Sequence, residues 1–463
     1  MNRKFYVTTA IDYTNDVIHI GHSYQKILAD VFARYHRLLE EKTFFLTGTD
    51  EHGQKVEKSA KEKGIPPQEF VDRIAAEDKA EWDKLNISYD RFIRTTDPDH
   101  IKLAQEFYLK AKKNGDIYLK KYTGLYCEGC ELFYDGGELV DGKCPLHPNR
   151  EIQRIEEENY FFKLSKYQSF LENLLKDGST FVVPDSKRKE VLSFVKKGLK
   201  DFSVSRQNVK WGIPVPDDPN HTIYVWFDAL INYISGAPDF WPANIHILGK
   251  DNQRFHAIFW PAMLKSTGYE LPKTILVHDF ISLNGQKISK SLGNIIRPSE
   301  LIEKFGVDAV RYYFLRYGPL TNDVDISIEK IQEVYNADLA NGLGNLVARI
   351  TQLAEQNLTK GTRPEPKGFP KEYTLAIENF ELNKAIGFIW KKIQALDQKI
   401  NETEPYKLVK EKPESGKKVI FELTQELYLI GRLLNPFLPE TSAKIKEAVI
   451  TNRKPKTLFP RLK

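Results

Sequence analysis

Two short motifs contain residue types that suit the binding of a nucleoside triphosphate. The first, His19-Ile20-Gly21-His22, lies between a strand-like run and a helical run of the chain. In an open α/β sheet this position lies outside the carboxyl ends of the strands, where N–H groups of a helix N-terminus bind phosphate. Gly21 has no Cβ, so a nucleotide could lie against the backbone, and both histidines could donate hydrogen bonds to phosphate oxygens. Alone, the motif is equally compatible with two surface histidines at a helix start.

The second motif is Lys287-Ile288-Ser289-Lys290-Ser291, which follows Asn284-Gly285 and precedes Gly293-Asn294. The flanking glycines predict a loop. Two lysines beside hydroxyl groups on a loop can neutralise charge that develops on a triphosphate in a transition state. A solvated turn is the alternative interpretation of this string in isolation.

The three cysteines of the chain, Cys127, Cys130 and Cys144, lie in one short stretch. An odd number in one place is a poor disulfide framework. Cys127-Glu-Gly-Cys130 and Cys144-Pro-Leu-His147 instead form two halves with the spacing of a tetrahedral Cys3His zinc site. Because protein side chains would fill all four positions, we expect one structural Zn²⁺ per chain with no open coordination position. Three unrelated thiols are the alternative.

These motifs need regular elements to position them, and the N-terminal part of the chain alternates between strand-like and helical runs. The strand-like runs are 5–11, 43–47 and 92–94, and helical periodicity covers 24–38 and 100–114. This order predicts a doubly wound parallel sheet. Glycine, proline and the cysteines interrupt the alternation over 117–221, and strand-like runs resume at 245–248 and 275–278. Amphipathic runs at 331–353, 375–400 and 421–434 then predict a helical bundle.

The expected fold is therefore α/β. A Rossmann-type doubly wound parallel sheet is split by a zinc-knuckle insertion and followed by an α-helical bundle. The expected boundaries are 1–116 and 223–297 for the two halves of the sheet domain, 117–222 for the insertion, 298–335 for a linker and 336–463 for the bundle.

Composition excludes several classes of protein. The 463 residues are 41% hydrophobic and 28% charged, which is typical of a globular protein and argues against a disordered or fibrous chain. No run approaches the roughly 20 apolar residues that span a bilayer, so we expect no membrane association. The first strand-like run begins at Phe5, which leaves no room for a targeting segment, so a cytoplasmic location is expected. The net charge of +5 is compatible with a nucleic-acid partner but does not require one.

Found together and in this order, the two motifs resemble the HIGH and KMSKS signatures of class I aminoacyl-tRNA synthetases, with Ile288 where methionine is usual. Further segments narrow the resemblance to the methionyl-tRNA synthetases: 5–22, 47–53, 224–230, 249–251, 256–264 and 458–462. The resemblance spans essentially the whole chain. It implies a ligase that activates methionine with ATP to methionyl-adenylate and pyrophosphate, then transfers methionyl to the 3′-terminal adenosine of tRNA(Met). Mg²⁺ would accompany the ATP.

The resemblance also implies the roles of individual residues. Charge stabilisation would fall to His19, His22, Lys287 and Lys290, and the ATP contacts would be His19, Gly21, His22, Gly249, Asp251, Ile281 and Lys290. The methionine pocket would be formed by Ile11, Tyr13, Asp50, Trp226, Tyr233, His256 and Phe259. Asp50, just past the second strand-like run, could pair with the α-ammonium group, and aromatic walls suit a polarizable thioether. Each apolar member could otherwise be an ordinary core residue, and Asn252 departs from the aliphatic residue that many relatives carry there.

In the helical part, Asn345 and Arg349 lie four residues apart, hence on one helix face. They match the family's anticodon-reading pair, and Tyr406 occupies the position where the family usually carries a stacking tryptophan. An arginine and an aromatic ring suit the splayed bases of a single-stranded loop. The resemblance thus makes 336–463 an anticodon-binding domain and 298–335 a region that contacts the tRNA stem. Without it, an ordinary polar helix face is the better interpretation.

Alternative functions differ in what they require of the sequence. A synthetase for valine or leucine would carry a large editing insertion, which does not fit between Ile117 and His221, and one for cysteine would use metal in its substrate pocket. A non-catalytic tRNA-binding or regulatory protein on a decayed scaffold would not need both lysine and histidine motifs intact. The expected partners are methionine, ATP and tRNA(Met). A monomer is expected because the chain carries no appended C-terminal dimerisation module.

Overall fold

The computed structural model describes residues 3–15, 17–134, 138–145, 147–288, 293–361, 364 and 368–463. The chain folds into two compact units. Unit 1 contains Met1–Ile18, Glu41–Asp83 and Ser88–Asp279, and unit 2 contains His19–Glu40, Lys84–Ile87 and Phe280–Lys463. Each unit is therefore assembled from segments that are far apart in the sequence.

Unit 1 is built on a 7-stranded parallel sheet. The strand order is β2 (Asp12–Tyr13), β3 (Lys42–Asp50), β1 (Lys4–Thr9), β13 (Ile245–Gly249), β14 (Thr274–His278) and β8 (Val182–Val183), and β4 (Arg91–Arg94) pairs with β3. Strands β13 and β14 are buried along their whole length, as in parallel sheets that are covered on both faces. In the centre, Thr8 of β1 pairs with His246 of β13, 238 residues later. The predicted parallel sheet, interrupted by an insertion, is confirmed.

Eight helices of unit 1 accompany this sheet in the described residues. They are α2 (Gln54–Glu62), α3 (Pro67–Lys84), α4 (Pro98–Lys113), α5 (Gln168–Leu174), α6 (Asp185–Val195), α7 (Val225–Ala229), α8 (Asn232–Ser235) and α9 (Trp260–Thr267). Helix α4 contacts α8 and α9, and its buried residues include His100, Ala104, Phe107 and Ala111. Their spacing of three and four residues is the helical periodicity that the sequence predicts for this segment.

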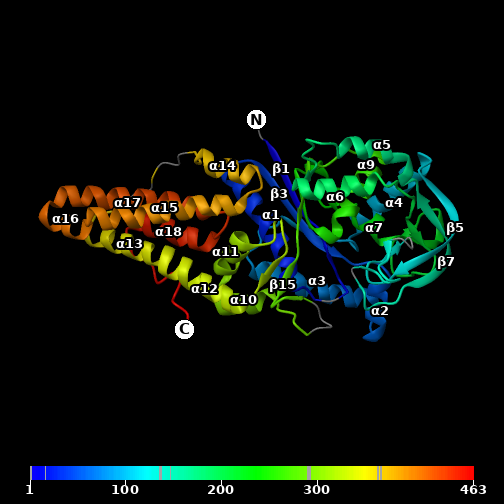
Figure 1. Cartoon of the computed structure of the whole chain (residues 1–463), viewed down its shortest axis with the longest axis horizontal. Coiled ribbons are helices and arrows are strands. Elements are labelled where there is room, and N and C mark those ends of the chain that lie inside the picture. Colours follow the sequence, from blue (N-terminus) through cyan, green and yellow to red (C-terminus); the bar gives the residue numbers. More distant parts are fainter. Residues whose placement is uncertain are drawn as a thin grey trace. The chain divides into compact units, whose positions relative to one another are not determined.

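The insertion between the halves of the sheet is antiparallel. Strands β5 (Ile117–Cys127) and β7 (Gln153–Phe162) run side by side from Ile117 opposite Phe162 to Tyr126 opposite Gln153 (Figure 1). They form a 4-stranded sheet with β6 (Leu132–Tyr134) and β9 (Phe202–Ser203), and β10 (Ser205–Arg206), β12 (Asp218–Ile223) and β11 (Pro214–Val215) form a smaller one. Strand β5 ends at Cys127, so the cysteine-containing segment lies in the connection from β5 to β7.

Unit 2 combines helix α1 (Ile20–Leu38) with the C-terminal part of the chain. A small sheet contains β16 (Gln286–Lys287), β15 (Ile281–Leu283) and β17 (Val324–Ile326), and α10 (Pro298–Phe305) and α11 (Val307–Tyr317) lie between β16 and β17 in the sequence. The helices that follow are α12 (Ile328–Val334), α13 (Asn345–Asn357), α14 (Lys371–Glu378), α15 (Leu382–Thr403), α16 (Pro405–Glu411), α17 (Pro413–Leu434) and α18 (Pro439–Thr451). Figure 1 shows α13, α15, α17 and α18 packed alongside one another, which confirms the predicted bundle.

Two helical predictions differ from the structure in detail. The run 331–353 contains a π-helical segment, Tyr335–Gly344, between α12 and α13. The run 375–400 is wrong as a single helix, because the chain breaks between α14 and α15. At this break Phe380 adopts a left-handed φ of 64°, and its ring packs edge-on against Phe32 of α1 with 5.7 Å between centroids. Tertiary packing therefore ends a helix where the sequence contains neither glycine nor proline.

A buried ion pair joins α1 to the bundle within unit 2. Arg311 of α11 is fully buried, and its Nη2 lies 2.6 Å from Oδ2 of Asp30 in α1. The same guanidinium donates to the main-chain oxygens of Pro436 and Phe437 at 3.1 and 2.9 Å. One side chain thus connects the helix that begins at the histidine motif with the turn before α18.

Replacing Asp30 with asparagine should destabilise the protein strongly. The Asp30→Asn change preserves shape but leaves the buried Arg311 guanidinium without its carboxylate, a loss that typically costs about 3–5 kcal/mol. Urea denaturation measures the effect. Glu414→Gln is the matched control, because it removes the same charge from an exposed pair with Lys417 and should cost less than about 1 kcal/mol. Equal shifts in the two variants would contradict the role assigned to the buried pair.

Candidate active site and metal centre

Asp50 is the last residue of β3 and lies at the carboxyl edge of the parallel sheet. The sequence places it just past the strand, and the structure includes it in the strand, opposite Tyr13 of β2. The main-chain N–H and the hydroxyl group of Thr14 both donate to the main-chain oxygen of Asp50, at 3.0 and 3.1 Å. The side chain is 6% exposed, and its Oδ1 has no hydrogen-bond partner among the described residues. Backbone pairing therefore holds a buried carboxylate whose own oxygen is still available.

The surroundings of Asp50 oppose its negative charge. Burial raises the pKa of Asp50 well above its ordinary value, and the nearby carboxylates of Asp228, Glu131 and Glu51 raise it further, whereas the N–H of His52 lowers it. Two of these neighbours have cationic or hydrogen-bonding partners of their own. Asp228 accepts from His52 at 2.7 Å and His100 at 2.6 Å, and Glu51 pairs with Arg94 at 2.6 Å. A ligand cation beside Asp50 would supply the charge that its surroundings lack.

The other predicted pocket residues gather in the same unit. Tyr233 belongs to the main hydrophobic cluster of unit 1, and Ile11, Trp226 and Phe259 pack against that cluster. Trp226 stacks on Phe255 with 3.5 Å between ring centroids, and Phe259 stacks on Phe202 with 4.1 Å. His256 and Phe259 lie in a π-helical turn, Phe255–Phe259, a local irregularity that is frequent at functional sites.

Burial sets the protonation of His256, and hydrogen bonds set its tautomer. Burial lowers the pKa of His256 to about 4, so its imidazole is neutral near pH 7. Its Nδ1 lies 2.9 Å from the main-chain oxygen of Asn252, and its Nε2 lies 2.6 Å from the Tyr233 hydroxyl group. Nδ1–H therefore donates to Asn252, and Nε2 accepts from Tyr233. Because Asn252 acts through its backbone, its departure from the family's usual residue does not remove this contact.

The predicted nucleotide contacts are divided between the units. Gly249 ends β13 in unit 1, and a Cβ on it would lie 2.7 Å from Oδ1 of Asp251, so the Asp251 carboxylate folds back over this glycine. Ile281 begins β15 in unit 2 and is buried, and Lys287 ends β16, where it is exposed. Ser289, Lys290 and Ser291 lie outside the described residues.

The histidine motif forms the N-terminal cap of α1. His19 is the N-cap residue, and its Nδ1 accepts from the N–H of Gly21 at 3.1 Å, while the N–H of His19 donates to Nδ1 of His22 at 3.2 Å. A Cβ on Gly21 would lie 2.7 Å from the His19 ring, so this cap itself requires glycine. Burial lowers the pKa of His22 to about 4, so it acts near pH 7 as a neutral hydrogen-bonding group. The N–H of Ile20 donates to the oxygen of Ile296 at 2.9 Å, which links the motif to the segment that follows the lysine motif.

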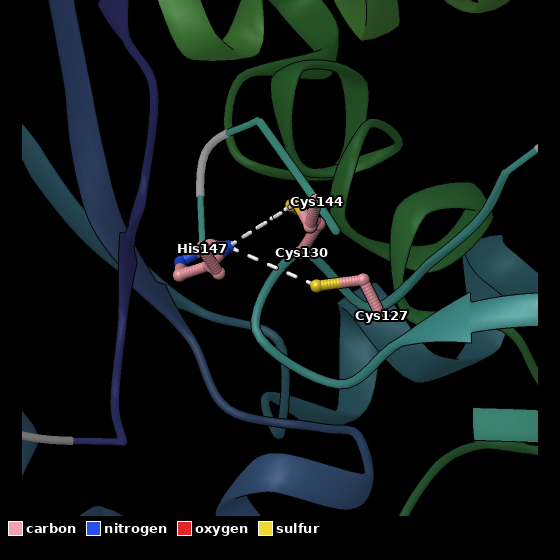
Figure 2. Close-up of side chains that lie close together, drawn as sticks. All are labelled: Cys127, Cys130, Cys144 and His147. Carbon is pink, nitrogen blue, oxygen red and sulfur yellow. Dashed lines mark hydrogen bonds between the residues drawn. The ribbon is translucent and has the colours of Figure 1, made fainter. Parts of the chain in front are cut away.

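The cysteines and His147 converge as the spacing predicts. The sulfurs of Cys127, Cys130 and Cys144 and a ring nitrogen of His147 all lie within 4.8 Å of one another (Figure 2). His147 Nδ1 is 3.9 Å from Cys127, 3.2 Å from Cys130 and 3.9 Å from Cys144. Tetrahedral Zn²⁺ with Zn–S bonds of about 2.3 Å would separate its ligands by roughly 3.8 Å, so the cluster fits this ion. The Tyr134 hydroxyl group lies 3.3 Å from Cys130 Sγ, where it could hydrogen-bond to a thiolate.

The bundle contains a groove of about 510 Å³ between α13 and α15. It is lined by Asn341, Gly342, Asn345, Leu346, Arg349, Ile393, Gln394, Asp397, Gln398, Asn401 and Glu402. Arg349 forms an ion pair with Asp397 and donates to Asn401 Oδ1 at 3.1 Å. The structure therefore brings Asn345 and Arg349 together in one groove. Tyr406 does not line it; it is 45% exposed on α16, and its hydroxyl group donates to Glu404 at 3.0 Å.

Sequence reasoning missed three groups that surround Asp50. These are the buried His52–Asp228–His100 cluster, the Glu51–Arg94 pair and Glu131, which accepts from Tyr13 at 2.7 Å. Glu51 and His52 lie inside the quoted segment 47–53, and Asp228 lies inside 224–230. The sequence therefore indicated both segments, but the pairing of His52 with Asp228 depends on contacts between residues far apart in the chain.

Comparison with known proteins identifies the family. The chain matches the family described as "tRNA synthetases class I (M)" over residues 5–154 and 148–351. It is 41% identical over 473 residues to the methionine–tRNA ligase of Caldanaerobacter subterraneus subsp. tengcongensis, with 96% of this chain and 74% of that protein covered. The methionine–tRNA ligase of Thermotoga maritima is 43% identical over 480 residues, with 98% and 76% covered.

Solved structures of methionyl-tRNA synthetases agree with this family assignment. Mycobacterium tuberculosis methionyl-tRNA synthetase in complex with methionyl-adenylate matches with a TM-score of 0.91 at 36% identity, over 99% of this chain and 100% of that one. The apo form of the same synthetase matches with a TM-score of 0.82 at 34% identity, over 100% and 99%. The fold and the matched family thus define a class I tRNA synthetase. Within that class, the chain belongs to the methionyl-tRNA synthetase family, and the resemblance seen in its motifs is confirmed.

Among the helices of the described ranges, none combines the length and the apolar character that a membrane-crossing helix needs.

The stability of Asp50→Asn, compared with that of the unaltered protein, should increase as the pH rises. The folded-state pKa of Asp50 lies above the ordinary value of about 3.9, so ionisation destabilises the fold as the pH rises from that value through the folded-state pKa. Asparagine cannot ionise. The melting temperature of Asp50→Asn, relative to the unaltered protein, should therefore be higher at pH 8 than at pH 5.

Asp83→Asn on α3 is the matched control for this measurement. Despite partial desolvation, hydrogen bonds from Lys79 and Tyr89 lower the pKa of Asp83, so it is ionised at both pH values. Its substitution should shift the melting temperature equally at pH 5 and pH 8. An equal, pH-independent shift in Asp50→Asn would contradict the electrostatic account of the buried carboxylate.

Proposed function

We propose that the protein is a methionine–tRNA ligase. It activates methionine with ATP to methionyl-adenylate and pyrophosphate and transfers the methionyl group to the 3′-terminal adenosine of tRNA(Met). The observation that carries this proposal is a buried carboxylate that has no cationic partner among the described side chains, in the same unit as an aromatic pocket with neutral polar groups. An amino acid with an α-ammonium group and a long uncharged side chain matches both parts.

In this proposal each predicted residue has a role in binding or orientation. Asp50 pairs with the ammonium group, and the thioether lies among Ile11, Tyr13, Trp226, Tyr233, His256 and Phe259. Sulfur contacts favourably with aromatic rings, and the Tyr233 oxygen is a neutral polar contact for it. Gly249, Asp251 and Ile281 contact the adenosine, and His19, Gly21, His22, Lys287 and Lys290 contact the phosphates.

The reaction depends on positioning and charge rather than on a protein nucleophile. The carboxylate of methionine attacks the α-phosphorus of ATP, and pyrophosphate leaves. A ribose hydroxyl group of the tRNA then attacks the activated carbonyl, and AMP leaves. His19 and His22 donate hydrogen bonds to phosphate oxygens, while Lys287 and Lys290 neutralise the charge that builds up on the leaving pyrophosphate. Mg²⁺ bound to ATP supplies further charge neutralisation, held by phosphates and water more than by protein side chains.

Zinc and tRNA complete the proposal. One Zn²⁺ is held by Cys127, Cys130, Cys144 and His147 and serves a structural purpose, because protein ligands occupy all four positions. Asn345, Arg349 and the exposed ring of Tyr406 contact the anticodon, after Arg349 exchanges its partners in the groove for a base. We assign 1–116 and 223–297 to catalysis, 117–222 to the zinc-bearing insertion, 298–335 to stem contact and 336–463 to anticodon binding. The monomeric state and the cytoplasmic location stay predictions.

Amino-acid-dependent exchange of pyrophosphate into ATP tests the activation step. Methionine should support exchange, whereas cysteine, valine and leucine should do so with kcat/KM lower by roughly 100-fold or more, because they are shorter or branched and do not match an unbranched thioether in shape. Exchange with one of these amino acids in place of methionine would show that the pocket is assigned wrongly. If no amino acid supports exchange, the proposed enzymatic function fails.

Metal analysis tests the zinc site. The purified protein should contain about one zinc per chain, and Cys144→Ser should lose it together with a large part of its thermal stability, because metal binding contributes directly to folding. Ser165→Ala in the same insertion, far from the cysteines in sequence, is the control and should retain zinc. A stable, metal-free protein would contradict the site.

A further inference from the structure

The cysteine-bearing segment contacts the methionine pocket at two consecutive residues. Trp226 Nε1–H donates to the main-chain oxygen of Cys130 at 3.1 Å, and the Tyr13 hydroxyl group donates to Oε1 of Glu131 at 2.7 Å. Trp226 and Tyr13 are both proposed pocket residues, and Cys130 is a proposed metal ligand. The polar atoms of two proposed pocket side chains therefore hydrogen-bond to Cys130 and Glu131 of the cysteine-bearing segment rather than to the parallel sheet.

The position of the Glu131 side chain is restricted by burial, by its backbone conformation and by close packing. It is 4% exposed and adopts a left-handed φ of 47°, which is uncommon for a residue with a side chain. A Cβ on Gly53 would lie 2.6 Å from Oε2 of Glu131, so the carboxylate fills the space that this glycine leaves open. Gly53 itself has a φ of 111°, a conformation suited to glycine. Backbone geometry and close packing thus restrict the Glu131 carboxylate to one position.

Glu131 also caps the helix that follows Asp50. Helix α2 begins at Gln54, and its N-cap residue Gly53 offers no side-chain acceptor. The N–H of Lys55, in the first turn, donates instead to Oε1 of Glu131 at 2.7 Å. A carboxylate at a helix N-terminus satisfies a free N–H group and interacts favourably with the helix dipole. Since β3 ends at Asp50 and α2 starts four residues later, this bond fixes the connection that carries Asp50.

Both elements beside Asp50 are therefore tied to one carboxylate. Tyr13 is the register partner of Asp50 in β2, and Lys55 lies at the start of α2. We propose that Glu131 is a positioning residue for methionine recognition, which holds Tyr13 and the β3–α2 connection so that Asp50 faces the ammonium group. This inference rests on the proposed function. Glu131 itself makes no contact with methionine in this account, so its loss should weaken methionine binding and leave ATP binding intact.

The first experiment compares Glu131→Ala with the unaltered protein in methionine-dependent pyrophosphate exchange. The variant loses two buried hydrogen bonds to one carboxyl oxygen, so the KM for methionine should rise roughly 10-fold or more, with the KM for ATP unchanged within about twofold. Glu131→Gln keeps an oxygen acceptor at the same position and should recover part of the loss. The Kd for methionine without ATP, measured by calorimetry, should rise in parallel.

Glu128→Ala is the matched control. Glu128 lies in the same segment, is buried, and pairs with Lys58 of α2 at 2.9 Å and Arg150 at 3.4 Å. It thus also joins the cysteine-bearing segment to α2, but neither Lys58 nor Arg150 is a proposed pocket residue. Its KM for methionine should stay within about twofold of the unaltered value. An equal rise in both variants would mean that any disturbance of the knuckle weakens binding, and the specific role of Glu131 would be overturned.

A double-mutant cycle tests the path through Tyr13. If Glu131 acts by holding the Tyr13 hydroxyl group, the rise in methionine KM for Tyr13→Phe with Glu131→Ala should be smaller than the product of the two single effects. Zinc content should stay at the unaltered level in Glu131→Ala. Independent effects, or a loss of zinc accompanied by equal loss of methionine and ATP binding, would overturn the proposal. Absence of exchange in the unaltered protein would instead refute the proposed function, so the two failures are distinguishable.

Discussion

A carboxylate buried beside other carboxylates is the constraint on which the proposed amino-acid pocket depends. Backbone pairing between β2 and β3 places Asp50 at the sheet edge whatever its state of ionisation. Its neighbours have partners within the protein: Asp228 binds two histidines, Glu51 binds Arg94, and Glu131 binds Tyr13 and α2. The folding energy of the sheet thus sustains an arrangement that is unfavourable by itself. Binding of an ammonium group and ionisation of Asp50 become coupled events.

The proposed pocket has carboxyl groups at one end and neutral polar groups at the other. Near Asp50 the polar groups are carboxylates, whereas Tyr233 and His256 form a hydrogen-bonded pair in which burial lowers the pKa of the imidazole. Methionine is divided in the same way, with its ammonium group at one end and a thioether at the other. An amino acid with a charged side chain would have to lose its hydration against the neutral aromatic end, which offers no opposite charge. In the proposed pocket, discrimination between amino acids would therefore depend on the absence of an opposite charge at the aromatic end as well as on the groups that are present.

The sequence predicted what depends on local spacing and missed what depends on distant contacts. The Cys127–Cys130 and Cys144–His147 pairs, the histidine motif at a helix start and the alternation of strands and helices all follow from neighbours in the chain, and the structure contains them. Glu131 could not be found in this way, because its partner Tyr13 lies 118 residues away and no periodicity connects them. The break between α14 and α15 was missed for the same reason: it contains no glycine or proline, and its left-handed residue Phe380 packs against the distant ring of Phe32.

The pairing of β1 with β13 has a consequence for the protein during its synthesis. Thr8 and His246 are neighbours in the finished sheet but are 238 residues apart in the chain. At about 5–20 residues per second, a ribosome needs roughly 10–50 s to make the intervening segment. Throughout that interval one edge of β1 has no β13 to pair with, and exposed strand edges favour association with other chains. The antiparallel insertion can fold before β13 has been synthesised, because its long strands β5 and β7 pair with each other.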